Sequence, residues 1–117
     1  MADALEERPT PVGDPSAAVG VVVEHYERRG GTALLMLAQE DHDPVAENAT
    51  AGGKAMHRDW VSQTFAPATD DDAVLDLLVV ATDVYTWKLM RKDRGHSRAV
   101  TEQRMHDLVR AVLDAGR

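Results

Sequence analysis

The stretch from Asp70 to Gly95, DDDAVLDLLVVATDVYTWKLMRKDRG, constrains the fold of this chain more than any other part of it. The three aspartates at its start can cap helix amides, and their negative charges are favourable at the positive end of a helix dipole. Its last residues are mostly basic, and Gly95 is a residue type that commonly ends helices. The stretch therefore predicts one long helix of about 23 residues, which is about 35 Å at 1.5 Å per residue.

This predicted helix is apolar around most of its circumference. Only Asp76 and Asp83, which lie on one line of the helix, form a narrow polar strip beside Trp87. A surface helix needs a single apolar stripe, so a helix of this kind has to be covered on two sides. We expect the core of the chain to cover one side and a second copy of the chain to cover the other.

Two Asp-Pro pairs predict the starts of two earlier helices, because Asp is a good N-cap and Pro fits the first helical position. After Asp14-Pro15, the first helix is expected to run to Gly30-Gly31. Thr32 is then expected to cap a short second helix, ALLMLAQE.

The helix after Asp43-Pro44 is expected to end before Pro67. Gly52-Gly53 in its middle predicts a kink, a break or a close contact, since glycine weakens a helix interior. Ser97 is expected to cap the last helix, SRAVTEQRMHDLVRAVLDAG.

These elements predict an all-α domain built as a five-helix orthogonal or antiparallel bundle. The last two helices are joined by a short turn, so they should lie antiparallel. Residues 1–13 are expected to form a partly disordered lead-in, and residues 14–117 to form the domain.

Composition limits the function classes. The chain has no cysteine, which excludes disulfides and thiolate metal sites. Its formal net charge is −7, whereas nucleic-acid binding usually needs a basic face, so we expect no nucleic-acid partner for this chain alone. The acidic start MADALEERP resembles no signal peptide, and no apolar run is long enough to span a bilayer. We therefore expect a cytoplasmic protein without a membrane partner.

The sequence contains no residue pattern typical of an enzyme, a metal site or a cofactor site. The acidic cluster from Glu40 to Asp43 is interpreted as a solvated helix end rather than a cation site. Glu102 and His106 are four residues apart, whereas the di-iron bundle motif needs a spacing of three and more carboxylates. We expect no catalytic residue, no metal and no cofactor.

A ligand pocket is the remaining candidate site. Methionines and aromatic side chains on the middle helices suit an irregular apolar cavity with one polar group. The alternatives are ordinary core packing and, for Asp83 with Trp87, a cradle for a cationic ligand. The predicted pocket residues are Met36, Met56, His57, Trp60, Asp83 and Trp87.

The predicted interface between two copies lies on the last two helices, as a four-helix bundle of about 1,600 Å² or more. Its predicted residues are Leu78, Tyr85, Leu89, Met105, Leu108 and Val112.

Three segments resemble one family in the same order. They are HYERRGGTALLMLAQEDHDPVAE, HRDWVSQTFAP and DVYTWKLMRKDRGHSRAVTEQRMHDLVRAVL. Together they are similar to the C-terminal domain of TetR/AcrR transcriptional regulators of the actinobacterial type. The resemblance covers about residues 15 to 115 and is most specific from Trp87 to Gly95.

The resemblance implies a bacterial effector-binding and dimerisation domain that senses a small, mostly apolar molecule. Family members carry an N-terminal helix-turn-helix, and only about 14 residues precede the first sensor-like helix here. The chain is then either a fragment of a longer regulator or a free-standing sensor domain. The alternative function is a ligand-free dimerisation module that pairs with itself or with a full-length regulator.

Overall fold

The computed structural model describes residues 8–116, and these residues form helices joined by short connections. The elements are α2 (Pro15–Gln39), α3 (Pro44–Thr64), α4 (Asp72–Ala81), α5 (Val84–Lys88), the π-helical turn η1 (Leu89–Asp93) and α6 (Arg98–Ala115). No strand occurs in this range, so the all-α prediction is confirmed. Within the same range, no helix combines the length and apolar character needed to cross a bilayer.

The helix starts follow the sequence signals. Asp14 accepts a hydrogen bond from the Ala17 amide at 3.0 Å, and Asp43 accepts one from the Val45 amide at 2.9 Å. Each is followed by Pro at the first helical position. Further along the chain, Asp71 caps α4 and Ser97 caps α6 in the same way. Side-chain oxygens thus satisfy amides that have no partner within the helix.

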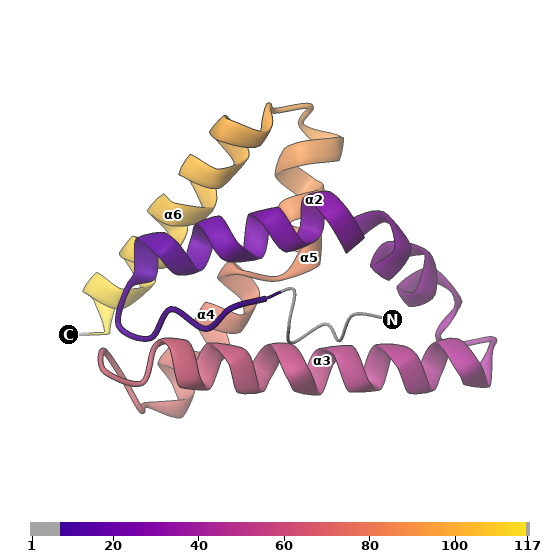
Figure 1. Cartoon of the computed structure of the whole chain (residues 1–117), viewed down its shortest axis with the longest axis horizontal. Coiled ribbons are helices and arrows are strands. Elements are labelled where there is room, and N and C mark those ends of the chain that lie inside the picture. Colours follow the sequence, from indigo (N-terminus) through magenta and orange to yellow (C-terminus); the bar gives the residue numbers. More distant parts are fainter. Residues whose placement is uncertain (1–7, 117) are drawn as a thin grey trace.

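Helices α2 and α3 run antiparallel, with residues 8–13 between them (Figure 1). Helices α5 and α6 pack against α2, whereas α4 packs against α3 and α6. The segment before α2 is held in place by two hydrogen bonds. The Trp60 indole donates to the Pro9 carbonyl at 2.9 Å, and the Gly13 amide donates to the Thr64 carbonyl at 3.1 Å. The predicted disorder of the lead-in concerns in part residues 1–7, which lie outside the described residues.

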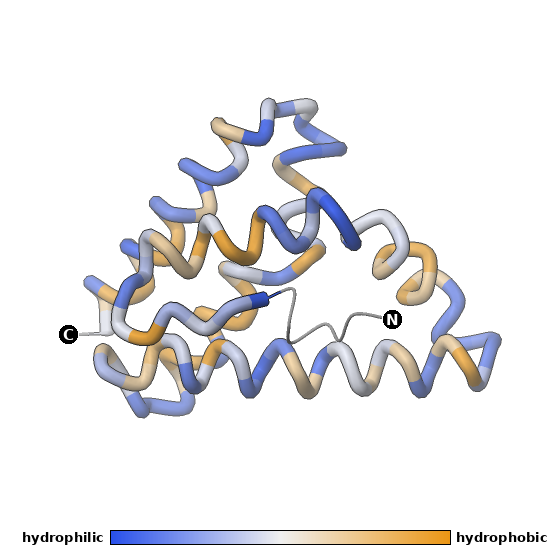
Figure 2. The backbone as a smooth tube through the Cα atoms, in the orientation of Figure 1, coloured by the Kyte–Doolittle hydropathy of each residue, from blue (hydrophilic) through white to orange (hydrophobic). Residues whose placement is uncertain are grey.

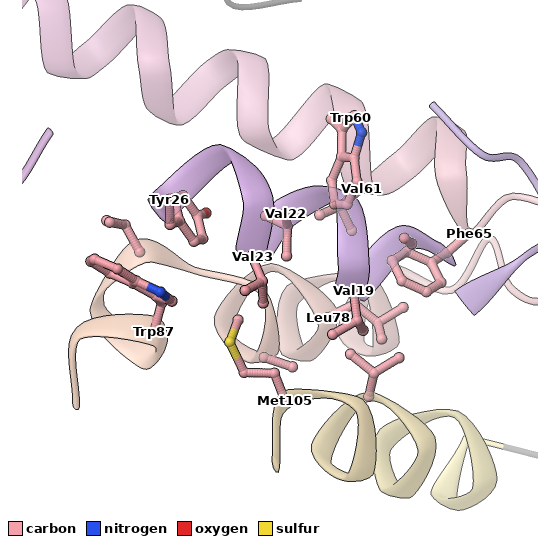
Figure 3. Packing of buried hydrophobic residues seen from close by; sticks show 14 of the residues in the cluster. Val19, Val22, Val23, Tyr26, Trp60, Val61, Phe65, Leu78, Trp87 and Met105 are labelled. Carbon is pink, nitrogen blue, oxygen red and sulfur yellow. The ribbon is translucent and has the colours of Figure 1, made fainter. Parts of the chain in front are cut away.

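The core lies where the five α-helices of the described chain meet. Figure 3 shows Val23 of α2 beside Met105 of α6, and Tyr26 beside Trp87, whose ring centroids are 6.0 Å apart. Figure 2 shows hydrophilic residues at the turn between α2 and α3 and at the turn before α6. The apolar residues that are fully buried include Val19, Val22, Val23, Val61, Phe65, Leu78, Met105 and Val109.

The prediction that the first helix ends at Gly30-Gly31 is wrong. Helix α2 continues through both glycines to Gln39, and Thr32 lies inside it rather than capping a second helix. Gly30 is buried, and a Cβ atom added there would lie 2.6 Å from Cζ3 of Trp87. Gly30 is therefore explained by a close contact with an indole ring, which the local sequence does not reveal.

The other glycine pair also leaves its helix intact. Gly52 and Gly53 lie inside α3, and an added Cβ atom at either position would meet no atom within 4 Å. Figure 1 draws α3 straight and unbroken, so the predicted kink, break or close contact is not found at Gly52-Gly53 within residues 8–116.

The single long helix expected from Asp70 to Gly95 is instead divided after Ala81. Thr82 ends α4, and Asp83 starts α5 by accepting a hydrogen bond from the Tyr85 amide at 3.0 Å. The Thr82 hydroxyl donates to the Leu78 carbonyl at 2.7 Å. Local side-chain hydrogen bonds of this kind compete with a continuous helix. The predicted division into five helices is therefore wrong at two places, although Gly95 does have the left-handed conformation expected of it (φ 72°).

Candidate functional site

A cavity of about 190 Å³ lies between α2, α3 and the junction of α4 with α5. Its walls combine apolar side chains with a few polar ones, as in small-molecule sites generally. The apolar lining residues include Ala33, Met36, Leu37, Ala49, Met56 and Val84, and the polar ones include Arg8, Tyr26, Thr50, Lys54, His57 and Asp83.

Four of the six predicted pocket residues line this cavity, namely Met36, Met56, His57 and Asp83. Trp60 lies behind the wall, with its ring stacked on that of His57 at a centroid distance of 6.0 Å.

Trp87 lies outside the cavity. It is 2% exposed, packs against Gly30 and donates from its indole nitrogen to Glu27 at 2.9 Å. The alternative of a cradle for a cation formed by Asp83 and Trp87 is not seen, because the Asp83 carboxylate caps α5 while the Trp87 ring is buried against α2.

His57 is the central polar group of the site, and its neighbours fix its tautomer. The Arg8 guanidinium donates to Nδ1 of His57 at 2.7 Å, and because arginine has no acceptor, Nδ1 carries no proton. Nε2 lies 3.2 Å from both the Val79 carbonyl and the Thr82 hydroxyl. A carbonyl can only accept, so the Nε2 proton points to the end of α4.

Burial and the neighbouring Arg8 charge lower the pKa of His57 from 6.5 to about 4. Desolvation penalises the imidazolium, and the guanidinium beside Nδ1 repels it. The ring is therefore a neutral hydrogen-bonding group at physiological pH.

The stability of the chain is expected to fall as the pH falls from about 6.5 to about 4. Between these two pH values His57 is protonated in the unfolded state but stays neutral in the folded state. Protonation therefore stabilises the unfolded state relative to the folded state. At pH 5 the loss attributable to His57 is expected to be about 2 kcal/mol relative to pH 7.5. Urea unfolding of the wild type and of His57→Gln at both pH values measures the difference, since Gln does not titrate. Equal losses in the two proteins would contradict the assignment.

Arg8 is one of several residues of the site that were not predicted from the sequence, and it is the one that carries a buried charge. It is 3% exposed, and its guanidinium carbon lies 5.5 Å from the centre of the Tyr26 ring and 5.1 Å from that of Trp60. Both distances are in the range of cation–π contacts. No local signal distinguishes Arg8 from the other charged residues of the lead-in, since the side chains that it contacts belong to α2 and α3.

Tyr26 connects the cavity to the junction between α4 and α5. Its hydroxyl donates to the Thr82 carbonyl at 2.8 Å, where α4 ends. Burial raises the pKa of the Tyr26 hydroxyl, so the group remains a donor. Two lining residues, Tyr26 and His57, are thus hydrogen-bonded to the same helix break.

The predicted interface residues divide into surface and core positions. Tyr85, Leu89 and Leu108 are 53%, 51% and 39% exposed, and Val112 is partly buried. Leu78 and Met105 do not reach the surface: both are 0% exposed in the chain's own core. Helix α4 packs against α3 and α6, and α6 packs against α2, so these two side chains face the chain's own core.

The remaining candidates form no cation site. Glu40 bonds to Lys54 and to the Thr50 hydroxyl, both at 2.9 Å. Glu102 and His106 line a second pocket of about 140 Å³. Across residues 8–116, no three His, Asp or Glu side chains gather closely enough to hold a metal ion.

Comparison with known proteins adds no relative. No family model matches the sequence, and neither a curated protein nor a solved structure matches the chain.

Proposed function

We propose that this chain is the effector-sensing and dimerisation domain of a TetR-like regulator and binds a small, mostly apolar molecule. The observation that carries the proposal is the cavity of about 190 Å³ lined by Met36, Met56, His57 and Asp83. A dry cavity of about 150 Å³ is enough for benzene, so this one suits a molecule with one ring or a short chain. The class of regulator rests on the sequence resemblance alone.

The position of the cavity suggests how binding would be transmitted. Its lining residues Tyr26 and His57 are hydrogen-bonded to Thr82, and Asp83 caps the next helix. A ligand that binds one conformation of the junction between α4 and α5 more tightly than another shifts the population toward that conformation. The signal would then reach α5 and α6, where the proposed second copy binds.

Tryptophan fluorescence tests the proposal, because Trp60 and Trp87 are the only two tryptophans. Small apolar compounds are expected to quench or shift the emission of Trp60, whose ring is stacked on His57 of the cavity wall. Trp60→Phe should remove most of the response. Trp87→Phe is the control and should retain it, because Trp87 lies outside the cavity. A panel of compounds without any saturable response would contradict the proposal.

A second candidate function is a dimerisation module without a ligand, and the exposed apolar surface favours it. Five large apolar side chains from α4 to α6 are at least 39% exposed: Leu77, Val80, Tyr85, Leu89 and Leu108. The elements that bear these side chains pack against one another, and exposed apolar side chains that gather on one surface mark protein–protein contacts. A second copy is the proposed partner, as the four-helix arrangement expected from the sequence requires.

Light scattering after size exclusion is expected to give the mass of a dimer at tens of micromolar. Leu108→Glu should shift the mass toward that of the 12.8 kDa monomer with little loss of stability, because the side chain is already exposed. Asn48→Asp, at an exposed position of α3, adds the same charge away from α4–α6 and is the control. A wild-type protein that remains a monomer would contradict the dimer.

A further inference from the structure

We infer that the ligand of the cavity is a small organic anion, an apolar body with one carboxylate, and that Arg8 binds the carboxylate. The inference rests on the proposed function, since it names the chemical class of the molecule sensed. It comes from a buried charge that residues 8–116 do not neutralise.

Arg8 is a cation in a place where cations are costly. It is 3% exposed, and burial of a charge is unfavourable unless the charge is paired and hydrogen-bonded. Its contacts are the faces of Tyr26 and Trp60 and the neutral Nδ1 of His57. No carboxylate within residues 8–116 forms an ion pair with it, and its Nε atom has no hydrogen-bond acceptor there.

The other charged groups of the cavity are already engaged. Lys54 is paired with Glu40 at 2.9 Å, and Asp83 accepts the Tyr85 amide at 3.0 Å. Arg8 therefore remains the cation that lines the cavity without an anionic partner among the described residues. His57 cannot serve as a second cation, because its Nδ1 faces the guanidinium.

A carboxylate matches what Arg8 offers. The guanidinium is a planar fork that binds carboxylates with two parallel hydrogen bonds, and such charge-assisted bonds are strong in a dry site. The half-buried Asp83 disfavours a ligand with several negative charges. Met36, Leu37, Met56 and Val84 supply apolar walls for the rest of the molecule. An aryl acetate or a short fatty acid has the appropriate size and charge.

Matched pairs of an acid and its amide test the inference on the wild-type chain. Phenylacetate against phenylacetamide, and hexanoate against hexanamide, differ in charge but hardly in shape. We expect each acid to bind about 10–100-fold more tightly than its amide, the range for a hydrogen bond to a charged group. Isothermal calorimetry and the Trp60 emission measure both members of each pair.

Variants of Arg8 test whether this residue causes the preference for the acid over its amide. Arg8→Met keeps an apolar stem against Tyr26 and Trp60 but removes the charge, and it should reduce the preference for the acid to less than about threefold. Arg8→Lys keeps the charge without the fork and should give an intermediate preference. Arg104→Met, at an exposed position of α6, is the control and should leave the preference unchanged.

The outcomes separate this inference from the proposed function. Equal binding of acids and amides to the wild type would overturn the inference and leave the ligand-sensing proposal standing. If none of the four compounds binds saturably, both the inference and the ligand-sensing proposal are overturned. If Arg8→Met does not fold, the comparison of acids with amides on the wild type still decides.

Discussion

Replacement of Leu78 by aspartate is expected to unfold the chain. Leu78 is 0% exposed and lies in the core, to which α2, α3, α4, α5 and α6 all contribute. Removal of a buried leucine side chain costs about 2–5 kcal/mol, and burial of a carboxylate without a partner adds several more. The sum is comparable to the whole stability of a domain of this size, about 5–15 kcal/mol. Far-ultraviolet circular dichroism should show loss of helix for Leu78→Asp.

The neighbouring residue provides the matched control. Leu77 is 55% exposed, so Leu77→Asp should keep the wild-type helix content and change the free energy of unfolding by less than about 0.5 kcal/mol in the monomer. It should also weaken the proposed dimer, because it places a charge on the apolar surface. Leu78→Ala gives a graded version of the core change, with an expected loss of about 2–5 kcal/mol in urea unfolding. Similar stabilities for Leu78→Asp and Leu77→Asp would contradict the placement of α4.

The sequence predicted the helix starts because each is determined within a few residues. Asp14, Asp43 and Ser97 cap the helices that follow them by accepting hydrogen bonds from amides two or three residues further along. The all-helical class follows from the same local signals together with the periodicity of apolar residues.

The helix interiors were predicted less well, because their continuity depends on contacts between distant residues. In sequence, Gly30 is typical of a helix end. In the structure, it lies inside α2, and its lack of a side chain leaves room for the ring of Trp87, which is 57 positions further along the chain. Thr82 and Asp83 resemble helix interior, yet the carbonyl of Thr82 is bound by Tyr26 of α2, which supports a break there. Local propensity is a weak guide where tertiary contacts of this kind decide.

The cavity was predicted in part for the same reason. Met36, Met56 and His57 lie at helical positions whose direction follows from periodicity, and these three residues do line the cavity. Arg8 lies in a segment without regular structure, so no period indicates which way its side chain points. Its role becomes visible only when α2 and α3 are placed on either side of it.

Replacement of Gly30 by valine is expected to lower the free energy of unfolding by about 2–3 kcal/mol, in the upper part of the range for overpacked cores. The added Cβ atom would lie 2.6 Å from Cζ3 of Trp87 and 3.0 Å from Cη2, and the ring is held by its hydrogen bond to Glu27. Either α2 or the indole has to move. We expect the displaced indole to change the emission spectrum of Trp87, which Trp60→Phe isolates from the other tryptophan.

The same substitution at Gly31 separates this contact from helix propensity. An added Cβ atom there meets nothing within 4 Å, so Gly31→Val should change the stability by less than about 0.5 kcal/mol. A smaller side chain at position 87 should relieve the clash, so Trp87→Leu is expected to cost less in the Gly30→Val background than in the wild type. This non-additivity, measured by urea unfolding of the four proteins, is the signature of a direct contact. Equal effects of valine at positions 30 and 31 on the free energy of unfolding would contradict the close contact between Gly30 and the Trp87 ring.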